Sequence, residues 1–157
     1  MLNGSVYAPP PIEVAVGIDE PQIRAVLSLW ADWAEEEGIE TYDERRLAMS
    51  LARRIQDGVW MPIVAWAGEF PVGMVEVMVL EDPFSGDITA YGDHAYLAEG
   101  YRGQGAFDAL VQGAIFIAEV LGATVQILPV GTKTRFLMPL YERYGFETAG
   151  YVMRRKV

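Results

Sequence analysis

The chain has 157 residues, of which 52% are hydrophobic, and it carries a formal net charge of −10 with no cysteine. This length suffices for one substantial core, so we expect a single domain. The missing cysteines exclude a disulfide framework, a thiolate zinc site and a cysteine nucleophile. The charge disfavours nucleic acid and anionic membranes as partners, and no apolar run approaches the roughly 20 residues of a membrane span. We therefore expect a cytoplasmic protein.

The N-terminal residues are predicted to lie outside the core. Residues 1–11 include three consecutive prolines, Pro9 to Pro11, which favour an extended arm. Residues 12–157 are then expected to form the single domain, which begins with a short strand at 12–16.

Two helices are predicted to follow this strand. Asp19 is placed to cap the first helix, with Gln22 as its partner in a capping box. An acidic run at 35–37 closes that helix, against the preference of the helix dipole. A second capping box, from Thr41 to Glu44, is predicted to open the next helix.

The middle of the chain is predicted to form strands. Residues 61–67 and 72–80 are joined by a hairpin turn at 68–71. In the second of these strands, Met74, Glu76 and Met78 occupy alternate positions. Glu76 is therefore expected to share one face of the strand with the two methionines.

The second half of the chain alternates between strand and helix patterns. A strand is predicted at 93–98, a helix at 107–121, a strand at 124–128, a helix at 135–144 and a strand at 146–155. Together with the N-terminal elements, this order predicts an α/β domain with a mixed central sheet.

The most informative segment lies between the strand at 93–98 and the helix that follows it. Its residues are Arg102, Gly103, Gln104, Gly105 and Ala106. Two glycines at a helix entrance allow backbone N–H groups to approach an anion, and the positive end of the helix dipole helps to hold it. The segment is therefore either a phosphate-binding loop or a tight connection between strand and helix.

A second motif decides how the loop is interpreted. Residues 139–147 form a leucine-tyrosine-glutamate run that ends in Gly-Phe, about 40 residues after the glycine loop. The two motifs, in this order, resemble those of the GNAT superfamily of acyl-CoA N-acyltransferases. The chain then ends one strand length later, which is most similar to the short members of that superfamily encoded by bacteriophages.

The resemblance implies a fold, a cofactor and a reaction. The fold is the GNAT-like fold, with a mixed, mostly antiparallel sheet flanked by helices. The cofactor is acetyl-CoA, whose pyrophosphate would be held by the backbone of residues 102–106 and by the Arg102 guanidinium. The strand that ends at Leu97 would splay from the strand at 124–128, and its free backbone groups would pair with the amide-bearing arm of the cofactor. The acceptor is a primary amine of a small molecule or a protein, which the acidic charge of the chain favours.

Resemblance also indicates the groups that move protons. Tyr141 is similar to the tyrosine acid of the family, although it could equally be a packing residue, in which case Tyr144 or water would be the acid. Asp93 occupies the strand where many members carry a glutamate base. His94 and Glu76 are further candidates. Adjacent strand residues point to opposite faces, so Asp93 and His94 can line one site only if a bulge intervenes.

Three residues depart from the family pattern. Phe107 stands where a small residue is usual, Thr134 where asparagine is common, and Pro139 inside the predicted last helix, which it would bend. These departures leave open an alternative function, in which the chain has kept the fold and lost the reaction. It would then be a structural or docking component, assembled as a homo-oligomer or in a bacteriophage virion.

Overall fold

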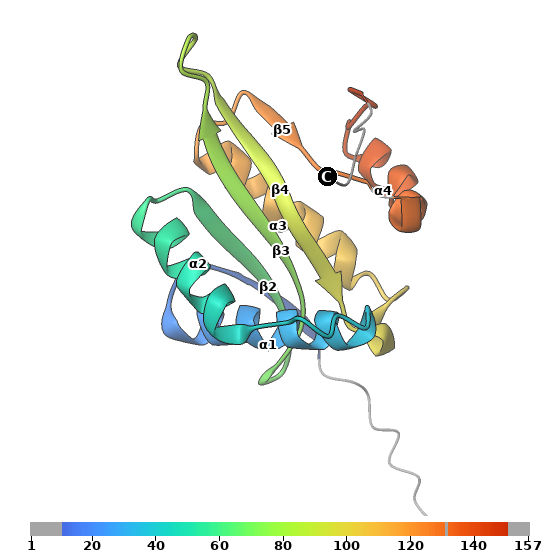
Figure 1. Ribbon diagram of the computed structural model, residues 1–157. Helices are drawn as coiled ribbons and strands as arrows, with labels where there is room; N and C mark the ends of the chain where they lie inside the picture. Colours follow the sequence, from blue (N-terminus) through green and yellow to red (C-terminus); the bar gives the residue numbers. More distant parts are fainter. Residues whose placement is uncertain (1–10, 131, 151–157) are drawn as a thin grey trace, which may run out of the picture.

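A computed structural model describes residues 11–130 and 132–150 of the chain, with a central sheet and helices on both of its faces (Figure 1). The strands are β1 (Ile12–Val16), β2 (Trp60–Ala67), β3 (Phe70–Glu81), β4 (Ile88–Leu97) and β5 (Val125–Ile127). The helices are α1 (Glu20–Glu36), α2 (Glu44–Gln56), α3 (Ala106–Val120) and α4 (Met138–Arg143), with 3₁₀ segments η1 (Glu99–Tyr101) and η2 (Thr132–Leu137). None of the helices in these two ranges combines the length and apolarity that a membrane span requires.

The sheet is mixed and mostly antiparallel, as predicted. Its strands lie in the order β1-β2-β3-β4-β5, and only the pair β4–β5 is parallel. Helices α1 and α2 cover one face of the sheet and α3 covers the other (Figure 1). The predicted hairpin joins β2 and β3, with Ala67 paired to Phe70.

Alternation along β2 and β3 divides the core into two layers. Ile63 and Val75 belong to the layer under α3, together with Leu110. Val64 and Met74 belong to the layer under α1 and α2. Because successive strand residues point to opposite faces, each strand contributes side chains to both layers. Glu76 shares its face with the methionines of β3, as predicted.

The start of α1 follows the prediction in its cap but not in its capping box. The Asp19 carboxylate accepts a hydrogen bond from the Gln22 N–H at 3.0 Å. The side chain of Gln22 does not return to the cap. It is buried instead, and its Oε1 accepts a hydrogen bond from Trp66 Nε1 at 3.0 Å. A tertiary contact to β2 therefore replaces the predicted local one.

The start of α2 corrects the prediction of Thr41 as its cap. The N-cap is Asp43, whose carboxylate accepts a hydrogen bond from the Arg46 N–H at 3.1 Å. Glu44 is consequently the first residue of the helix, too early to serve as the glutamate of a capping box. Two capping residues stand close together in the sequence, and the later one is used.

The C-terminal third differs most from the predicted elements. The strand predicted at 93–98 begins earlier, at Ile88. Pro139 lies in the first turn of α4 because η2 precedes it, so it does not bend a longer helix. Residues 146–150 contain no strand, and the remainder of the strand predicted at 146–155 lies outside the described residues, as does most of the predicted arm.

The pairing of β4 with β5 ends early. The two strands pair only from Thr89 to Tyr91, opposite Val125 to Ile127, while β4 continues to Leu97. Within residues 11–130 and 132–150, the following residues of β4 therefore have no neighbouring strand on this side, so β4 and β5 separate there as predicted. Half of the backbone polar groups of this stretch face the opening, where a ligand can pair with them.

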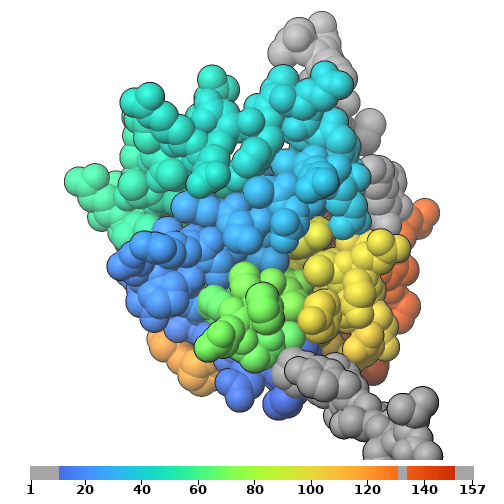
Figure 2. Space-filling model, turned by 90° about the horizontal axis from the view of Figure 1, so that it is seen from below, coloured from blue at the N-terminus to red at the C-terminus, as the bar shows by residue number. Residues whose placement is uncertain are grey.

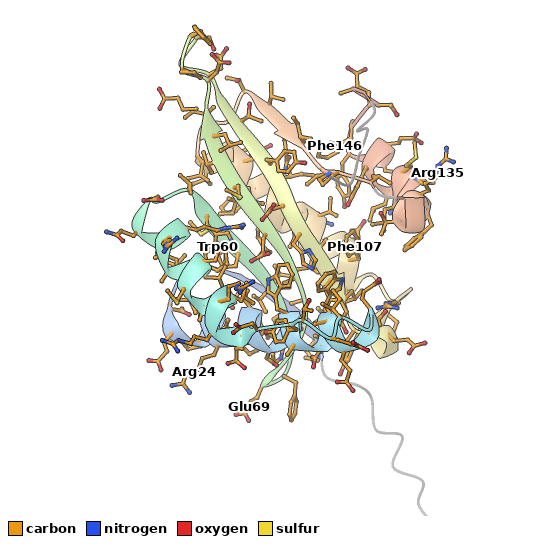
Figure 3. All side chains as sticks on the ribbon, in the orientation of Figure 1. Arg24, Trp60, Glu69, Phe107, Arg135 and Phe146 are labelled. Atoms are coloured by element: carbon orange, nitrogen blue, oxygen red, sulfur yellow. The ribbon has the colours of Figure 1, made fainter. Side chains whose placement is uncertain are left out.

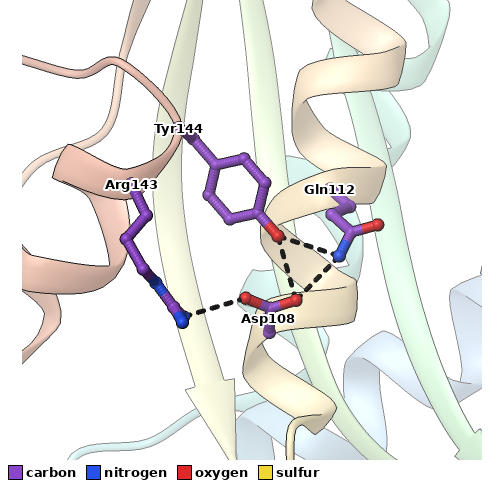
Figure 4. A network of polar contacts seen from close by, with 4 residues as sticks. All are labelled: Asp108, Gln112, Arg143 and Tyr144. Carbon is purple, nitrogen blue, oxygen red and sulfur yellow. Dashed lines mark hydrogen bonds and ion pairs between the residues drawn. The ribbon is translucent and has the colours of Figure 1, made fainter.

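Helix α4 is tied to α3 by a network of polar side chains (Figure 4). Asp108 accepts hydrogen bonds from the Tyr144 hydroxyl at 2.9 Å and from Gln112 Nε2 at 2.7 Å. Gln112 Nε2 also lies 2.8 Å from the Tyr144 hydroxyl, and Arg143 forms an ion pair with Asp108 at 3.2 Å. This network positions α4 on the far side of the opening between β4 and β5.

A close approach of β3 to the end of β4 yields a test of the fold. A Cβ atom on Gly73 would lie 2.7 Å from Leu97 Cδ1 and 3.0 Å from the Tyr96 carbonyl oxygen. Gly73→Ala should therefore lower the free energy of unfolding by roughly 1–3 kcal/mol through overpacking. Gly100→Ala, where nothing lies within 4 Å, is the control for chemical denaturation. Equal stability of the two variants would contradict the close packing described.

Candidate active site

A cleft of about 790 Å³ occupies the opening beside β4. Its walls come from α1, β3, β4, α3, η2 and α4. Among the lining side chains are Trp33, Glu36, His94, Leu97, Phe107 and Tyr141. The cleft therefore brings together residues from both predicted motifs and from the strand that precedes them.

The glycine loop borders this cleft at the start of α3. Gly103 and Gly105 have φ angles of 75° and 82°, a region that favours glycine. Gly105 is the N-cap, and the first hydrogen bond within the helix runs from the Ala109 N–H to the Gly105 carbonyl at 3.1 Å. The N–H groups of the preceding turn therefore have no partner within the helix, which suits an anion. Figure 2 shows the loop in yellow, between α1 in blue and the C-terminal part of the chain in orange.

Arg102 joins the loop to two other elements. Its Nε donates to the Leu97 carbonyl at 2.8 Å, and its Nη2 pairs with both carboxylate oxygens of Glu36 at 2.6 and 2.8 Å. The hydrogen bond with Glu36 raises the pKa of the guanidinium above its ordinary value. Arg102 thus clamps the end of β4 to the end of α1, and its predicted contact with a phosphate stays a prediction.

The other predicted loop residues have different surroundings. Gln104 is exposed, and its Nε2 donates to the Gly100 carbonyl at 2.9 Å, which closes η1 against the loop. Ala106 is buried under the first turn of α3. Both leave the backbone of the loop facing outward, because neither side chain covers it.

Tyr141 lies in the wall of the cleft formed by α4. Its side chain is 7% exposed, and burial raises the pKa of its phenol to about 12. Its ring centroid lies 5.8 Å from that of Phe146. Tyr141 therefore both packs and lines the cleft, whereas the Tyr144 hydroxyl is held by Asp108 and lies in the network between α3 and α4.

A β-bulge in β4 allows both Asp93 and His94 to line one site, although they are adjacent in the sequence. Glu76 is paired with His94, but the next residue, Val77, is paired with Gly92, so Asp93 is the extra residue. Both Asp93 and His94 line the cleft as a result. The Asp93 carboxylate forms an ion pair with Arg54 of α2 at 2.5 Å, which engages one of its two oxygens, Oδ2.

His94 packs against two tryptophan rings, an arrangement that the sequence did not indicate. Its ring stacks on Trp30 of α1 with centroids 3.9 Å apart, and it meets Trp33 edge-on at 4.7 Å. Burial lowers the pKa of its imidazole to about 4. His94 is therefore neutral at pH 7.

Glu76 lies behind His94 in the layer under α1 and α2. Its side chain is fully buried, and its Oε1 accepts a hydrogen bond from Trp60 Nε1 at 3.0 Å. Burial raises the pKa of the carboxyl group to about 7, although the neighbouring Trp30 and Trp60 lower it.

Two residues that departed from the expected pattern also line the cleft. Phe107 is half-buried beside β4 (Figure 3), and it packs against the core layer under α3 while forming part of the cleft wall. Thr134 lines the same cleft from η2. Phe107 therefore lines the cleft without filling it, because its ring also packs against the core layer under α3.

Glu36 is the site residue that sequence reasoning missed. It belongs to the acidic run at the end of α1, which predicts only a solvated face. Acidic residues at the C-terminal end of a helix oppose its dipole, and this mismatch is the only signal that a partner is required. The partner, Arg102, lies 66 positions away in the sequence. Within the ranges described, no three acidic or histidine side chains gather closely enough to hold a metal ion.

A comparison with known protein families identifies the family of the chain. The model of the acetyltransferase (GNAT) family matches residues 24–146. The chain belongs to the GNAT acetyltransferase family. No curated protein has a sequence that matches it.

Solved structures share the fold along almost the whole chain. One is a predicted acetyltransferase from Clostridium acetobutylicum with acetyl-CoA, with TM-score 0.72, 16% identity and coverage of 92% of this chain and 96% of that chain. Another is an aminoglycoside acetyltransferase from an uncultured soil metagenomic sample in complex with sisomicin, with TM-score 0.75, 13% identity and coverage of 93% and 95%. A third is a ribosomal-protein-alanine N-acetyltransferase from Brucella melitensis, with TM-score 0.69, 21% identity and coverage of 93% and 100%. Identities this low show a common fold only.

The buried carboxyl group makes stability depend on pH. The pKa of Glu76 is about 7 in the folded chain and near 4.5 when unfolded, so the folded state binds more protons between these values. Stability present below pH 4.5 is therefore lost as the pH rises through 7. Relative to Glu76→Gln, the wild type should lose about 3 kcal/mol of unfolding free energy between pH 4.5 and 8.

Denaturation with urea at a series of pH values measures this difference. His94 has the opposite dependence, since its lowered pKa makes stability fall as the pH drops from 6.5 through 4. Below pH 7 the Glu76 side chain is protonated and, like glutamine, uncharged, so the contribution of His94 should be similar in the two proteins. Parallel stability curves for the wild type and Glu76→Gln would show that the pKa of Glu76 is the same in the folded and unfolded chain.

Proposed function

We propose that the chain is an N-acetyltransferase that moves an acetyl group from acetyl-CoA to a primary amine. The observation that carries this proposal is the single cleft in which the free edge of β4, the open glycine loop and Tyr141 meet. Membership of the GNAT acetyltransferase family supports it. So does the similar structure from Clostridium acetobutylicum, which holds acetyl-CoA.

Backbone groups account for cofactor binding in this proposal. The N–H groups of residues 103–106 hold the pyrophosphate at the start of α3. The Arg102 N–H, which was predicted to join them, donates instead to the Glu99 carbonyl at 3.2 Å. The edge of β4 up to Leu97 pairs with the amide groups of the pantetheine arm, as one strand pairs with another. Arg102 contributes by fixing the end of β4 against α1, and its guanidinium lies close enough to the loop to add a charged contact.

The reaction itself requires no covalent enzyme intermediate. A neutral amine attacks the thioester carbon, the new C–N bond forms, and the C–S bond breaks. Backbone N–H groups along the free edge of β4 stabilise the oxyanion that develops on the carbonyl oxygen. The proton lost by the attacking nitrogen ends on the departing sulfur, so the products are an amide and the free thiol.

Tyr141 is the group that meets the departing sulfur. With a pKa of about 12 its phenol remains protonated at neutral pH, so it is always a donor there. A thiol has a reference pKa near 8.5, so complete transfer of the phenol proton to the thiolate is uphill. We therefore assign Tyr141 a hydrogen bond to the sulfur. Through this bond the proton lost by the attacking nitrogen reaches the sulfur, and the phenol is protonated again at the end of the step.

Phe107 is one of the three departures that left the docking alternative open. Its ring packs against the core layer under α3, and the cleft beside it still has a volume of about 790 Å³. This geometry favours the enzyme over a fold that has lost its reaction. Assembly as a homo-oligomer or in a virion, and a cytoplasmic location, stay predictions, as does the Asp93 base.

The acceptor is a primary amine of a small molecule or of a protein. The two acceptor classes both occur among proteins of this fold, as the aminoglycoside and ribosomal-protein acetyltransferases illustrate. The net charge of −10 favours an amine that arrives as a cation.

The glycine loop provides a test of cofactor binding. At Gly105, with φ of 82° and open space around its Cβ position, alanine strains the backbone and places a methyl group before the loop N–H groups. Gly105→Ala should weaken acetyl-CoA binding about tenfold, as for one lost hydrogen bond to a charged group. Gly58→Ala is the matched control, because Gly58 has φ of 68° and equally open surroundings at the end of α2.

Calorimetric titration with acetyl-CoA measures both affinities. The two variants should lose similar stability, roughly 1–2 kcal/mol, because both force alanine into the left-handed region. Only Gly105→Ala should lose affinity. Absence of acetyl-CoA binding by the wild type at millimolar ligand would contradict the proposed function.

Tyr141→Phe tests the chemical step. The variant keeps the ring that packs against Phe146 and removes only the hydroxyl, so stability and acetyl-CoA affinity should stay close to the wild type. The turnover number should fall about 10²-fold, the lower end of the range for a lost proton donor. Tyr144→Phe, which removes a hydroxyl held between Asp108 and Gln112, is the comparison. An unchanged turnover number in Tyr141→Phe would make Tyr141 a packing residue.

A further inference from the structure

Glu76 is the one fully buried acidic side chain in the part of the chain that the structure describes. It lies in the middle of β3, where an apolar residue would normally complete the layer under α1 and α2. Only one of its oxygens is accounted for, since Oε1 accepts from Trp60 while Oε2 has no partner among the described residues. A carboxyl group whose role was packing alone would be expected to have both oxygens bonded.

His94 stands directly opposite Glu76 on the neighbouring strand. Opposite residues of an antiparallel pair project from the same face with Cβ atoms roughly 4.5–5.5 Å apart, so the two side chains are neighbours. His94 Nε2 is also buried and unpartnered within the described residues. Among the described residues, Glu76 Oε2, His94 Nε2 and Trp30 Nε1 are thus three buried atoms without a hydrogen-bond partner on one side of the sheet, and the imidazole nitrogen and the carboxyl oxygen have complementary chemistry.

The surroundings fix both groups while leaving one route to the cleft. Trp30 covers the imidazole face at 3.9 Å, and its own Nε1 is directed toward Glu76 without completing a hydrogen bond of normal geometry. Trp33 closes the edge of the imidazole ring. His94 itself lines the cleft, whereas Glu76 does not. Of the two groups, His94 is therefore the one that meets the cleft directly.

We propose that His94 is the base that takes the proton from the acceptor amine, and that Glu76 is a positioning residue that holds His94 in the required tautomer. This assignment rests on the proposed acetyl transfer. It replaces Asp93, whose carboxylate is engaged by Arg54 on the outer side of the bulge. The bulge makes the assignment geometrically possible, because it places His94 opposite Glu76 and on the cleft at once.

Protons balance in this scheme. The Glu76 carboxylate accepts the Nε2–H of the neutral imidazole, directly or through one water molecule, which leaves Nδ1 as the free acceptor. An ammonium group in the cleft transfers one proton to Nδ1 and becomes the neutral amine that attacks the thioester. The imidazolium formed is stabilised by the carboxylate behind it and returns its proton to solvent after the product leaves.

The pKa of Glu76 supports this arrangement, and the negative charge of its carboxylate opposes the burial that lowers the pKa of His94. Glu76 ionises at about pH 7, so the carboxylate that orients the imidazole is present above neutrality. The charged groups that face the pair are Asp93 of β4, which raises both pKa values, and Arg54 of α2, which lowers that of Glu76. From α1 and β2 the neighbours are indole rings, which carry no charge. Activity should therefore rise with pH through about 7.

Because the chain has one histidine, its imidazole nitrogens can be observed without assignment. In untagged protein labelled with ¹⁵N-histidine, the Nε2–H tautomer should become dominant as the pH passes about 7. Glu76→Gln should abolish this step. Trp60→Phe should move it to higher pH, because the lost hydrogen bond had favoured the carboxylate. Glu81→Gln, the same change at the exposed end of β3, is the control and should leave the step in place.

Kinetics with a panel of primary amines complete the test. His94→Gln should lower the turnover number by about 10²- to 10⁴-fold at pH 7, with an unchanged KM for acetyl-CoA. Glu76→Gln should flatten the rise of activity with pH, and Glu81→Gln should retain it. A pH-independent imidazole spectrum in the wild type would overturn the pairing of His94 with Glu76. An unchanged pH profile in Glu76→Gln, or an unchanged turnover number in His94→Gln, would overturn the catalytic assignment.

The two proposals fail in distinguishable ways. If the wild type binds no acetyl-CoA and acetylates no amine, the proposed function fails, and the catalytic role of His94 fails with it. The spectrum of His94 depends on neither cofactor nor acceptor, so the pairing with Glu76 is decided independently. If acetyl transfer is present but insensitive to both variants, the proposed function stands and this inference does not.

Discussion

The early end of pairing between β4 and β5 is the constraint on which the remaining arrangement depends. Backbone N–H and C=O groups that leave a sheet need other partners, and beyond Tyr91 the edge of β4 has none from β5. The strand stays extended because β3 pairs along its other side as far as Leu97. Its free edge therefore faces an opening rather than a neighbour. Everything that lines the cleft, from the glycine loop to α4, is placed relative to that edge.

Arg102 shows how such an edge is kept rigid without a second strand. A free strand end frays easily, but here the last carbonyl of β4 accepts a hydrogen bond from a guanidinium that is itself fixed by Glu36. A bidentate pair of this kind restricts both position and orientation. The same residue begins the glycine loop, so the edge that would pair with the cofactor arm and the loop that would hold its phosphates share one anchor.

Local patterns in the sequence were sufficient to predict most of the fold. They could not predict which residues far apart in the sequence contact each other. Alternating hydrophobic residues located β2 and β3, and the glycines before an apolar helical stripe located α3. Nothing local distinguishes Thr41 from Asp43 as a cap. Nor does strand periodicity reveal a bulge, which is why both Asp93 and His94 reach the cleft despite their adjacency. The pairing of Glu36 with Arg102 and the enclosure of His94 by indole rings depend on how α1 packs across the sheet.

The network around Asp108 has a mechanical consequence for the cleft. Asp108 stands in the first turn of α3, two residues after the glycine loop ends, and it holds the last residues of α4 through Arg143 and Tyr144. The loop predicted to hold the phosphates and the wall that carries Tyr141 are therefore linked through the Asp108 side chain. A displacement of the first turn of α3 is transmitted to Tyr141 through the contacts of the Asp108 side chain. A ligand bound at the glycine loop therefore affects the position of Tyr141 at the other end of the cleft.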